Sequence, residues 1–268
     1  MLTQINSRPL ELTKIKPIRS GAIGTITMDM LNRDLHNPDL PAVCRSCEAR
    51  HGGVCSVLEP AQLAELTRHS TRRRIEAGSA FIGQGESVSS YSNILKGVVK
   101  LSKVMADGRQ QIVGLQFAPH FMGRPFTGES RMAAEAATDT EICVFPRRTL
   151  ERLVAATPQL EHQLHSQALK ELDEARDWML TLGRKTAREK VASFLSLIAS
   201  HSEPEAGDSS VFDLPLSRAD IADFLGLTIE TVSRQMTRLK ADGVVEIANY
   251  RHVTVPDLER LAAAAGND

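Results

Sequence analysis

The clearest pattern of apolar and polar positions along the chain lies in residues 214–243. Ser217 followed by Asp220 has the spacing of a capping box and predicts the start of a first helix. Gly226 sits where that helix has to turn, and Thr228 is suited to cap a second helix. The pattern therefore predicts two short helices joined by a tight turn.

The second helix, expected to run to about Leu239, has two distinct faces. At about 100° per residue, Val232, Met236 and Leu239 share a face that packs. The opposite face is polar and holds Glu230, Ser233, Arg234 and Thr237. Arginine donates two hydrogen bonds to guanine, glutamate accepts from cytosine, and serine leaves room for a thymine methyl, so this face suits major-groove reading. The alternative is an ordinary solvated face with a Glu-Arg pair at spacing four.

Charge restricts how the chain binds DNA. The net charge is −1, and from Arg184 onward 10 Lys and Arg stand against 13 Asp and Glu, a net charge of −3. Affinity must therefore come from local basic clusters, namely Arg184, Lys185, Arg188 and Lys190, and on the second helix Arg234, Arg238 and Lys240. The predicted DNA contacts are Thr228, Glu230, Ser233, Arg234, Thr237, Arg238 and Lys185. Residues 244–255 alternate like a hairpin turning at 248–251, which predicts the wing of a winged helix.

Residues 58–146 show short alternating runs broken by glycine. This pattern predicts an antiparallel β-roll or barrel, preceded by a short helix at 60–69. The basic run Arg72, Arg73 and Arg74 is interpreted as a solvated strand edge.

Residues 149–182 are predicted to be helical, with Pro158 ending a first piece or starting a second. Apolar residues in the second piece follow the spacing of a coiled-coil seam: Ala168, Leu172, Ala175, Met179 and Leu182. We expect this helix to pair with a second copy, because helix-turn-helix readers usually bind two half-sites; packing on the β-roll is the alternative. His162 and His165 are interpreted as part of a solvated face.

The expected fold class is α+β, with a β-roll sensor domain, a long dimerisation helix and a winged helix-turn-helix. Gly183 is expected to interrupt the long helix and begin a basic hinge, followed by a helix at 187–200. The predicted division is a tail with little fixed structure (1–40), a cysteine-rich loop (41–57), the β-roll (58–148), the dimerisation helix (149–182) and the DNA-binding domain (183–268).

The chain contains four cysteines, Cys44, Cys47, Cys55 and Cys143. In a reducing compartment, three cysteines crowded into one short loop favour a metal centre over a disulfide. The C-x2-C element brings two thiolates together, and the Gly52-Gly53 pair lets the backbone fold back so that a third can join them. A structural zinc site is the alternative, although its usual pattern pairs two C-x2-C elements.

Cys143 lies in a run whose alternation puts it on the strand face opposite Ile142 and Val144. Cys143 has two possible roles: a small buried hydrophobic residue, or the fourth ligand of an iron-sulfur cluster. Such a cluster needs one ligand for each iron.

The segment LSRADIADFLGLTIETVSRQMTRLK closely resembles the helix-turn-helix of the CRP/FNR family of bacterial transcription regulators. Glu230, Ser233 and Arg234 are similar to its FNR branch. The C-x2-C-x7-C spacing plus one later cysteine is similar to regulators of the FnrL and FnrN kind. This resemblance implies that the four cysteines hold an oxygen-labile 4Fe-4S cluster, that the half-site is TTGAT with the inverted repeat ATCAA, and that the loop 106–109 contacts RNA polymerase.

Relatives that bind a cyclic nucleotide use a Gly-Glu segment and an Arg-Ser pair. Neither element lines up with FMGRPFTGESRMAAEAATDTE, so we expect the nucleotide pocket to be absent.

The expected function is an oxygen-responsive transcription activator, not an enzyme, that binds palindromic double-stranded DNA as a homodimer while its cluster is intact. One alternative is a ligand-gated regulator of the CRP type with a zinc-stapled N-terminus. Another is an iron-sulfur or zinc enzyme with an accessory domain, but no nucleophile-base pair, phosphate loop or paired-carboxylate motif supports it. The chain lacks the roughly 18-residue apolar run of a membrane span and a secretory signal, so we expect a cytoplasmic protein without a membrane partner.

Overall fold

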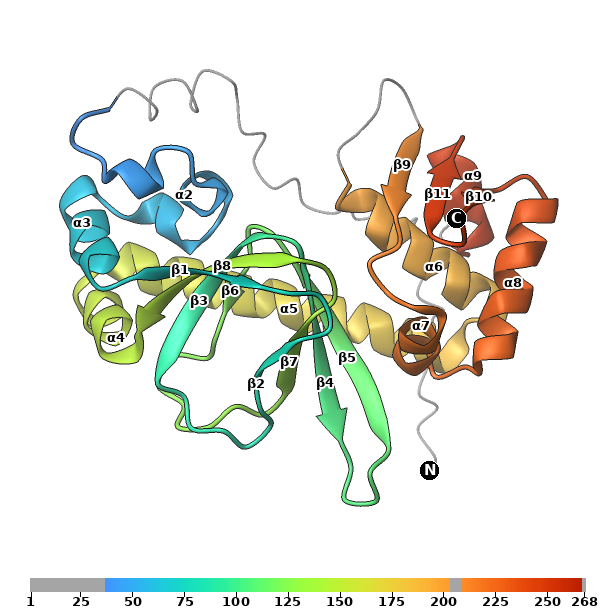
Figure 1. The fold of residues 1–268 in the computed structure, drawn as a ribbon, viewed down its shortest axis with the longest axis horizontal. Helices are drawn as coiled ribbons and strands as arrows, with labels where there is room; N and C mark the ends of the chain where they lie inside the picture. Colours follow the sequence, from blue (N-terminus) through green and yellow to red (C-terminus); the bar gives the residue numbers. More distant parts are fainter. Residues whose placement is uncertain (1–36, 203–208, 267–268) are drawn as a thin grey trace, which may run out of the picture.

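The computed structural model describes residues 37–202 and 209–266. A β-roll and a smaller C-terminal domain lie side by side, and the long helix α5 (Pro158–Arg184) runs behind both of them (Figure 1). The predicted α+β architecture is confirmed. Residues 1–36 of the tail predicted at 1–40 lie outside the described residues, but its last residue, Leu40, is buried in the core beside the cysteine loop.

Short helical turns precede the β-roll. They are η1 (Ala42–Cys44), α2 (Glu48–Gly52), η2 (Val54–Val57) and α3 (Pro60–Arg68). The last of these confirms the helix predicted at 60–69. Its N-terminus is capped by a reciprocal Glu59 and Gln62 pair, with Pro60 at the first helical position.

The β-roll consists of two four-stranded antiparallel sheets. One has the order β1 (Thr71–Ile75), β8 (Thr140–Pro146), β3 (Ser90–Lys96) and β6 (Phe121–Met122). The other has the order β2 (Ala80–Ile82), β7 (Ala133–Ala136), β4 (Val98–Val104) and β5 (Gln110–Phe117). Ile94, Val99 and Ile142 belong to the core between the sheets, which the period-two alternation predicted.

Helices α4 (Arg147–Ala156) and α5 are separated at Thr157, with Pro158 starting the second helix as the sequence suggested. The expected interruption at Gly183 is wrong, because α5 continues through it to Arg184. A helix tolerates one glycine at a cost of about 1 kcal/mol. Thr186, the N-cap of the next helix, places the actual break just beyond.

The C-terminal domain packs helices against a small sheet. Its elements are α6 (Ala187–Ser200), β9 (Ser210–Asp213), α7 (Arg218–Leu225), α8 (Ile229–Ala241), β10 (Glu246–Ala248), β11 (His252–Val255) and α9 (Leu258–Ala264). The helix at 187–200 and the hairpin are confirmed. Strand β9 was not predicted; it pairs with β11 and makes the wing a three-stranded sheet.

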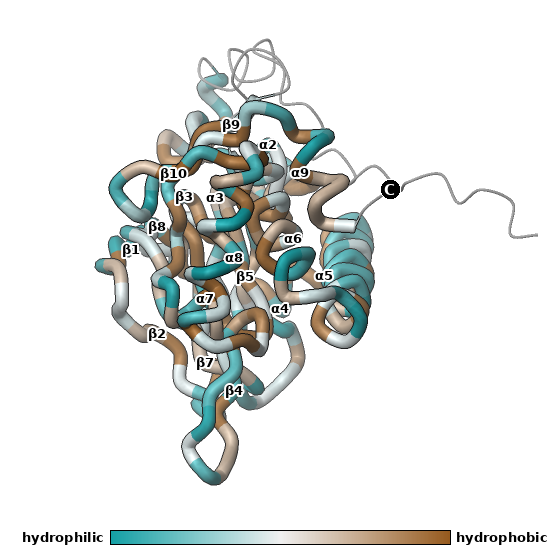
Figure 2. The backbone as a smooth tube through the Cα atoms, turned by 90° about the vertical axis from the view of Figure 1, so that its right-hand side faces the viewer, coloured by the Kyte–Doolittle hydropathy of each residue, from teal (hydrophilic) through white to brown (hydrophobic). Residues whose placement is uncertain are grey.

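Hydropathy follows this architecture. In Figure 2 brown and teal stretches alternate along the strands, whereas α5 is largely teal. Within residues 37–202 and 209–266, no helix combines the length and hydropathy that crossing a bilayer requires.

Candidate functional site

The two helices of the reading motif begin as their sequence predicts. Ser217 Oγ accepts a hydrogen bond from the Asp220 backbone N–H at 3.1 Å, and Gly226 ends α7 in the left-handed region at φ 61°. Thr228 Oγ1 accepts from the Thr231 N–H at 3.2 Å and so caps α8. These local hydrogen bonds fix the turn and therefore the direction in which α8 leaves the domain.

Helix α8 buries one face and exposes the other, as the periodicity predicted. Val232, Met236 and Leu239 are at most 2% exposed. The exposed residues include the predicted reading face, Glu230, Ser233, Arg234 and Thr237, and two further predicted DNA contacts, Thr228 and Arg238. α8 lies at the outer edge of the molecule in Figure 1, so this polar face is accessible to a large partner.

Arg234 and Glu230 present opposite charges on this face. Arg234 Nη2 donates to Thr231 Oγ1 at 3.4 Å, a long contact that the side chain can exchange for a base edge. Hydrogen bonds from its own backbone N–H and from Thr228 keep the pKa of Glu230 below its usual range. Glu230 is therefore an ionised acceptor at neutral pH, as contact with a cytosine amino group requires.

The basic segment before α6 is already engaged within the protein. Lys185 is half-buried and donates to Ser193 Oγ at 2.9 Å, and burial lowers the pKa of its amine. Arg188 pairs with Asp242 at 2.5 Å. The predicted role of Lys185 as a phosphate contact therefore stays a prediction, and it would require a rearrangement of this side chain.

The tip of the wing was not predicted as a contact but is highly exposed. Asn249 and Tyr250 have φ values of 49° and 62°, and Tyr250 is 87% exposed. Asparagine tolerates this left-handed region, which is the sequence signal for a tight hairpin turn. Arg218 Nη2 donates to the Tyr250 carbonyl at 3.3 Å and ties the turn to α7.

The structure brings the four cysteines together around one cavity. They are free thiols, with Cys44 and Cys55 buried and Cys47 and Cys143 half-buried. Cys44 and Cys55 come from η1 and η2, Cys47 precedes α2, and Cys143 comes from the middle of β8. The cavity measures about 280 Å³ and has a mainly apolar lining that includes Leu63, Leu66 and Phe145.

Strand pairing explains how Cys143 reaches the loop. In the sheet, Cys143 is directly opposite Arg72 on β1 and Asn93 on β3, so these three side chains share one face. Ile142 and Val144 join the core between the sheets instead, as the alternation predicted. Arg72 Nη2 donates to the Val43 carbonyl at 2.5 Å and attaches this row of the sheet to the cysteine loop.

Arg72, Arg73 and Arg74 are exposed on edge strand β1, as expected for a solvated strand edge. The contact between Arg72 and the cysteine loop was missed, because it joins residues 29 positions apart.

The cavity is unfavourable for isolated thiolates. Burial raises the pKa of Cys55 to about 12 and that of Cys44 to about 11, and mutual repulsion among the cysteines adds to both. Burial also raises the pKa of Cys143. A bound cation reverses this preference, because a coordinating thiol loses its proton outright.

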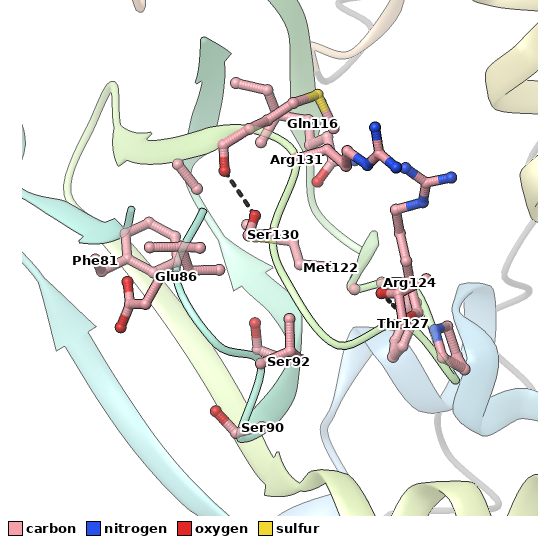
Figure 3. Close-up of a pocket in the computed structure, with 18 of the residues that line it drawn as sticks. Phe81, Glu86, Ser90, Ser92, Gln116, Met122, Arg124, Thr127, Ser130 and Arg131 are labelled. Atoms are coloured by element: carbon pink, nitrogen blue, oxygen red, sulfur yellow. Dashed lines mark hydrogen bonds between the residues drawn. The ribbon is translucent and has the colours of Figure 1, made fainter. Parts of the chain in front are cut away.

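A second cavity, of about 600 Å³, lies between the β-roll and α5 (Figure 3). The expected absence of a pocket is therefore wrong, because a cavity is present. The expectation that no cyclic nucleotide binds there stays a prediction. Its lining includes Arg124, Arg131 and Ser130, and Ser130 Oγ donates to the Met132 carbonyl at 2.6 Å (Figure 3). The cavity is formed by the walls of the β-roll and by α5, so it is present whether or not the Gly-Glu and Arg-Ser elements line up.

The predicted seam on α5 is largely uncovered in the single chain. Ala168, Leu172, Ala175 and Met179 are exposed, and Leu182 is half-buried. Met179 is 72% exposed and Leu172 45% exposed. The alternative that this face packs on the β-roll does not account for such exposure, although Ala168 and Leu172 also border the larger cavity.

Several contacts join the β-roll and α5 to the C-terminal domain. Lys100 Nζ on β4 is 2.9 Å from Glu135 and 2.7 Å from Asp220 on α7. Gln111 Nε2 on β5 donates to the Asp223 carbonyl at 2.6 Å. Trp178 on α5 packs against Phe224, with ring centroids 4.6 Å apart. The first helix of the reading motif is therefore held by both the β-roll and α5.

Comparison with known proteins agrees with this arrangement. Residues 72–157 match the cyclic nucleotide-binding domain, and residues 189–264 match the Crp-like helix-turn-helix domain. A probable transcriptional activator of Rhizobium leguminosarum bv. viciae is 64% identical over 87% of this chain and 98% of its own length. The transcriptional activator protein FnrL of Cereibacter sphaeroides is 42% identical over 84% and 92%. The structure of FixK2 from Bradyrhizobium japonicum is 33% identical, with a TM-score of 0.67 over 73% of this chain and 96% of that one.

A β-roll joined by a long helix to a winged helix-turn-helix with an exposed reading face defines a DNA-binding transcription regulator. The chain belongs to the CRP/FNR family of such regulators.

Proposed function

We propose that this regulator is an oxygen-responsive transcription activator that binds palindromic DNA as a homodimer while its cysteines hold a 4Fe-4S cluster. The observation that carries the proposal is the convergence of Cys44, Cys47, Cys55 and Cys143 on one apolar cavity beside α5. Relatives named as transcriptional activators, FnrL among them, support the proposal.

The residues around the cavity fit an iron-sulfur cluster. All four donors are thiols, the ligands that hold such clusters. Among the described residues, no three His, Cys, Asp or Glu side chains are grouped to bind one metal ion. Sulfurs around a single zinc would lie roughly 3.8 Å apart, given the usual bond length and tetrahedral geometry. Thiols spread around a wider cavity favour a polynuclear group with one cysteine for each iron.

The cysteine loop also packs directly on the dimerisation helix. Leu160 and Leu164 of α5 belong to the same apolar cluster as Cys44 and Cys55, and η2 contacts α5. When bound, the cluster would supply an oxygen-sensitive link between this loop and β8. Loosening that link would release the loop from Leu160 and so alter the helix on which the dimer depends.

Dimer formation follows from the uncovered seam on α5. An apolar stripe of Leu172 and Met179 on a helix of 27 residues suits pairing with the same stripe of a second copy. Two reading helices would then bind two half-sites at once, which raises affinity without any new contact to DNA. The proposed site is TTGAT followed by the inverted repeat ATCAA.

We also propose the remaining partners. The loop 106–109 forms the tip of the β4–β5 hairpin, which projects from the roll in Figure 1, and there Met105 is 56% exposed. Such a projection is accessible to RNA polymerase. We expect no cyclic nucleotide in the larger cavity, because the Gly-Glu and Arg-Ser elements do not line up in this stretch. Binding to DNA and reduced cysteines together favour a cytoplasmic location.

The iron and acid-labile sulfide content of anaerobically purified protein tests the proposal. The wild type should contain both, whereas Cys143→Ser should lose the visible absorbance of the cluster and most of its iron. Serine has nearly the same volume, so thermal unfolding of the two metal-free proteins should differ little and serves as the control. Zinc without sulfide in the wild type would contradict the proposal, and a full iron and sulfide content in Cys143→Ser would remove that residue from the ligands.

A further inference from the structure

Asn93 links the β-roll to the cysteine loop through its side chain. It lies on β3, is 2% exposed, and is directly opposite Cys143 on β8. Its Nδ2 atom is 3.3 Å from Cys55 Sγ and donates a hydrogen bond to it. One residue of a central strand therefore neighbours the strand cysteine and contacts a cysteine of the loop.

Burying the Asn93 amide lowers the stability of the fold, so its presence here suggests that the hydrogen bond to the Cys55 sulfur has a function. Its Oδ1 atom is buried and has no hydrogen-bond partner among the described residues. An unsatisfied buried acceptor destabilises the folded protein, whereas leucine has a similar shape and would avoid this penalty. A neutral thiol could donate to or accept from the amide, but a metal-bound thiolate can only accept. The N–H···S orientation is therefore the one that a ligating Cys55 requires.

Resting on the proposed iron-sulfur function, we propose that Asn93 is a positioning residue of the cysteine site. Its N–H group holds the Cys55 sulfur on the side of the cavity nearest Cys143 and withdraws electron density from the iron-sulfur bond. Hydrogen bonds to cysteine sulfur and other outer-shell contacts orient ligands and tune the groups they hold. By fixing the position of the Cys55 sulfur, which outweighs the weaker iron-sulfur bond, Asn93 helps to keep iron bound in a site that joins a loop to a sheet.

Iron release under anaerobic conditions tests this role. Wild-type protein and Asn93→Leu are reconstituted with iron and sulfide, and transfer of iron to a ferrous chelator is followed over time. The variant should release iron about tenfold faster, the lower end of the range for lost outer-shell contacts. Its Fe–S(Cys) stretching bands in the resonance Raman spectrum should also move to higher frequency, because the loss of the hydrogen bond strengthens the bond to iron.

Ser92→Ala is the matched control. Ser92 is the preceding residue on β3, is 5% exposed, and faces the other cavity (Figure 3). Ser92→Ala should release iron at the wild-type rate. Identical iron release and identical Raman bands in Asn93→Leu and the wild type would overturn the role of Asn93 while leaving the cluster in place. Wild-type protein that takes up no iron and sulfide would overturn both proposals.

A measurement that leaves Asn93 unchanged covers the case in which Asn93→Leu does not fold. Reconstitution in D2O replaces the amide protons by deuterons, and the hydrogen bond predicts a shift of the Fe–S(Cys) bands relative to protein reconstituted in H2O. Thr67 and Ser70 also line the cavity, so the part of the shift that disappears in Ser70→Ala is assigned to Ser70. No deuterium shift in Ser70→Ala would contradict the role of Asn93.

Discussion

At the scale of single residues, Arg234 is the side chain predicted to read the DNA sequence. It is exposed on α8, and its long contact to Thr231 leaves the guanidinium able to turn toward a base. If it donates two hydrogen bonds to guanine, Arg234→Ala should cost about 1–3 kcal/mol of binding and relax specificity at that base pair alone. Competition binding with duplexes altered at each half-site position measures both effects.

Arg238 provides the matched control one turn further along the same helix. It is exposed beyond the predicted base-contacting positions and suits a phosphate. Arg238→Ala should weaken binding to all sequences alike and reduce the salt dependence by about one counterion. A loss in Arg234→Ala that is equal for the TTGAT site and a scrambled duplex would disprove base reading by Arg234.

At the scale of elements, the helices of the C-terminal domain could be predicted because their signals are local. The hydrogen bonds that start α7 and α8 join residues three positions apart, and Gly226 marks the turn between them. Strand β9 could not be found in this way, because it forms only by pairing with β11 about forty residues later. The alternation around Cys143 predicted which face it occupies, but not its neighbours Arg72 and Asn93, since register between distant strands leaves no local pattern.

The seam of α5 gives a prediction at the same scale. Leu172→Glu should leave the monomer folded but place two like charges against each other in the dimer. Losing simultaneous contact with two half-sites should lower DNA affinity about 100-fold or more. Leu180→Glu is the control, since Leu180 is 60% exposed on α5 outside the predicted seam. Sedimentation of the anaerobic proteins should show monomer for the first variant and dimer for the second, and a dimeric Leu172→Glu would mean that another face pairs.

At the scale of the whole molecule, the described contacts form a continuous path from the cysteines to the reading helix. The cysteine loop packs on the start of α5 through Leu160, and Trp178 near its end packs on Phe224 of α7. Lys100 adds a second connection, because it joins β4 to Asp220 beside the N-cap of that helix. These connections join residues far apart in sequence, so the individual contacts along the path and the ion pair could not be read from the chain.

Tight DNA binding is proposed to require the intact 4Fe-4S cluster. The most direct test is the affinity of one anaerobic protein sample for a duplex carrying TTGAT and its inverted repeat, measured before and after exposure to air. Affinity should fall as the visible absorbance disappears, and sedimentation should show the dimer dissociating in parallel. Unchanged affinity after complete loss of the absorbance would contradict the proposed oxygen response.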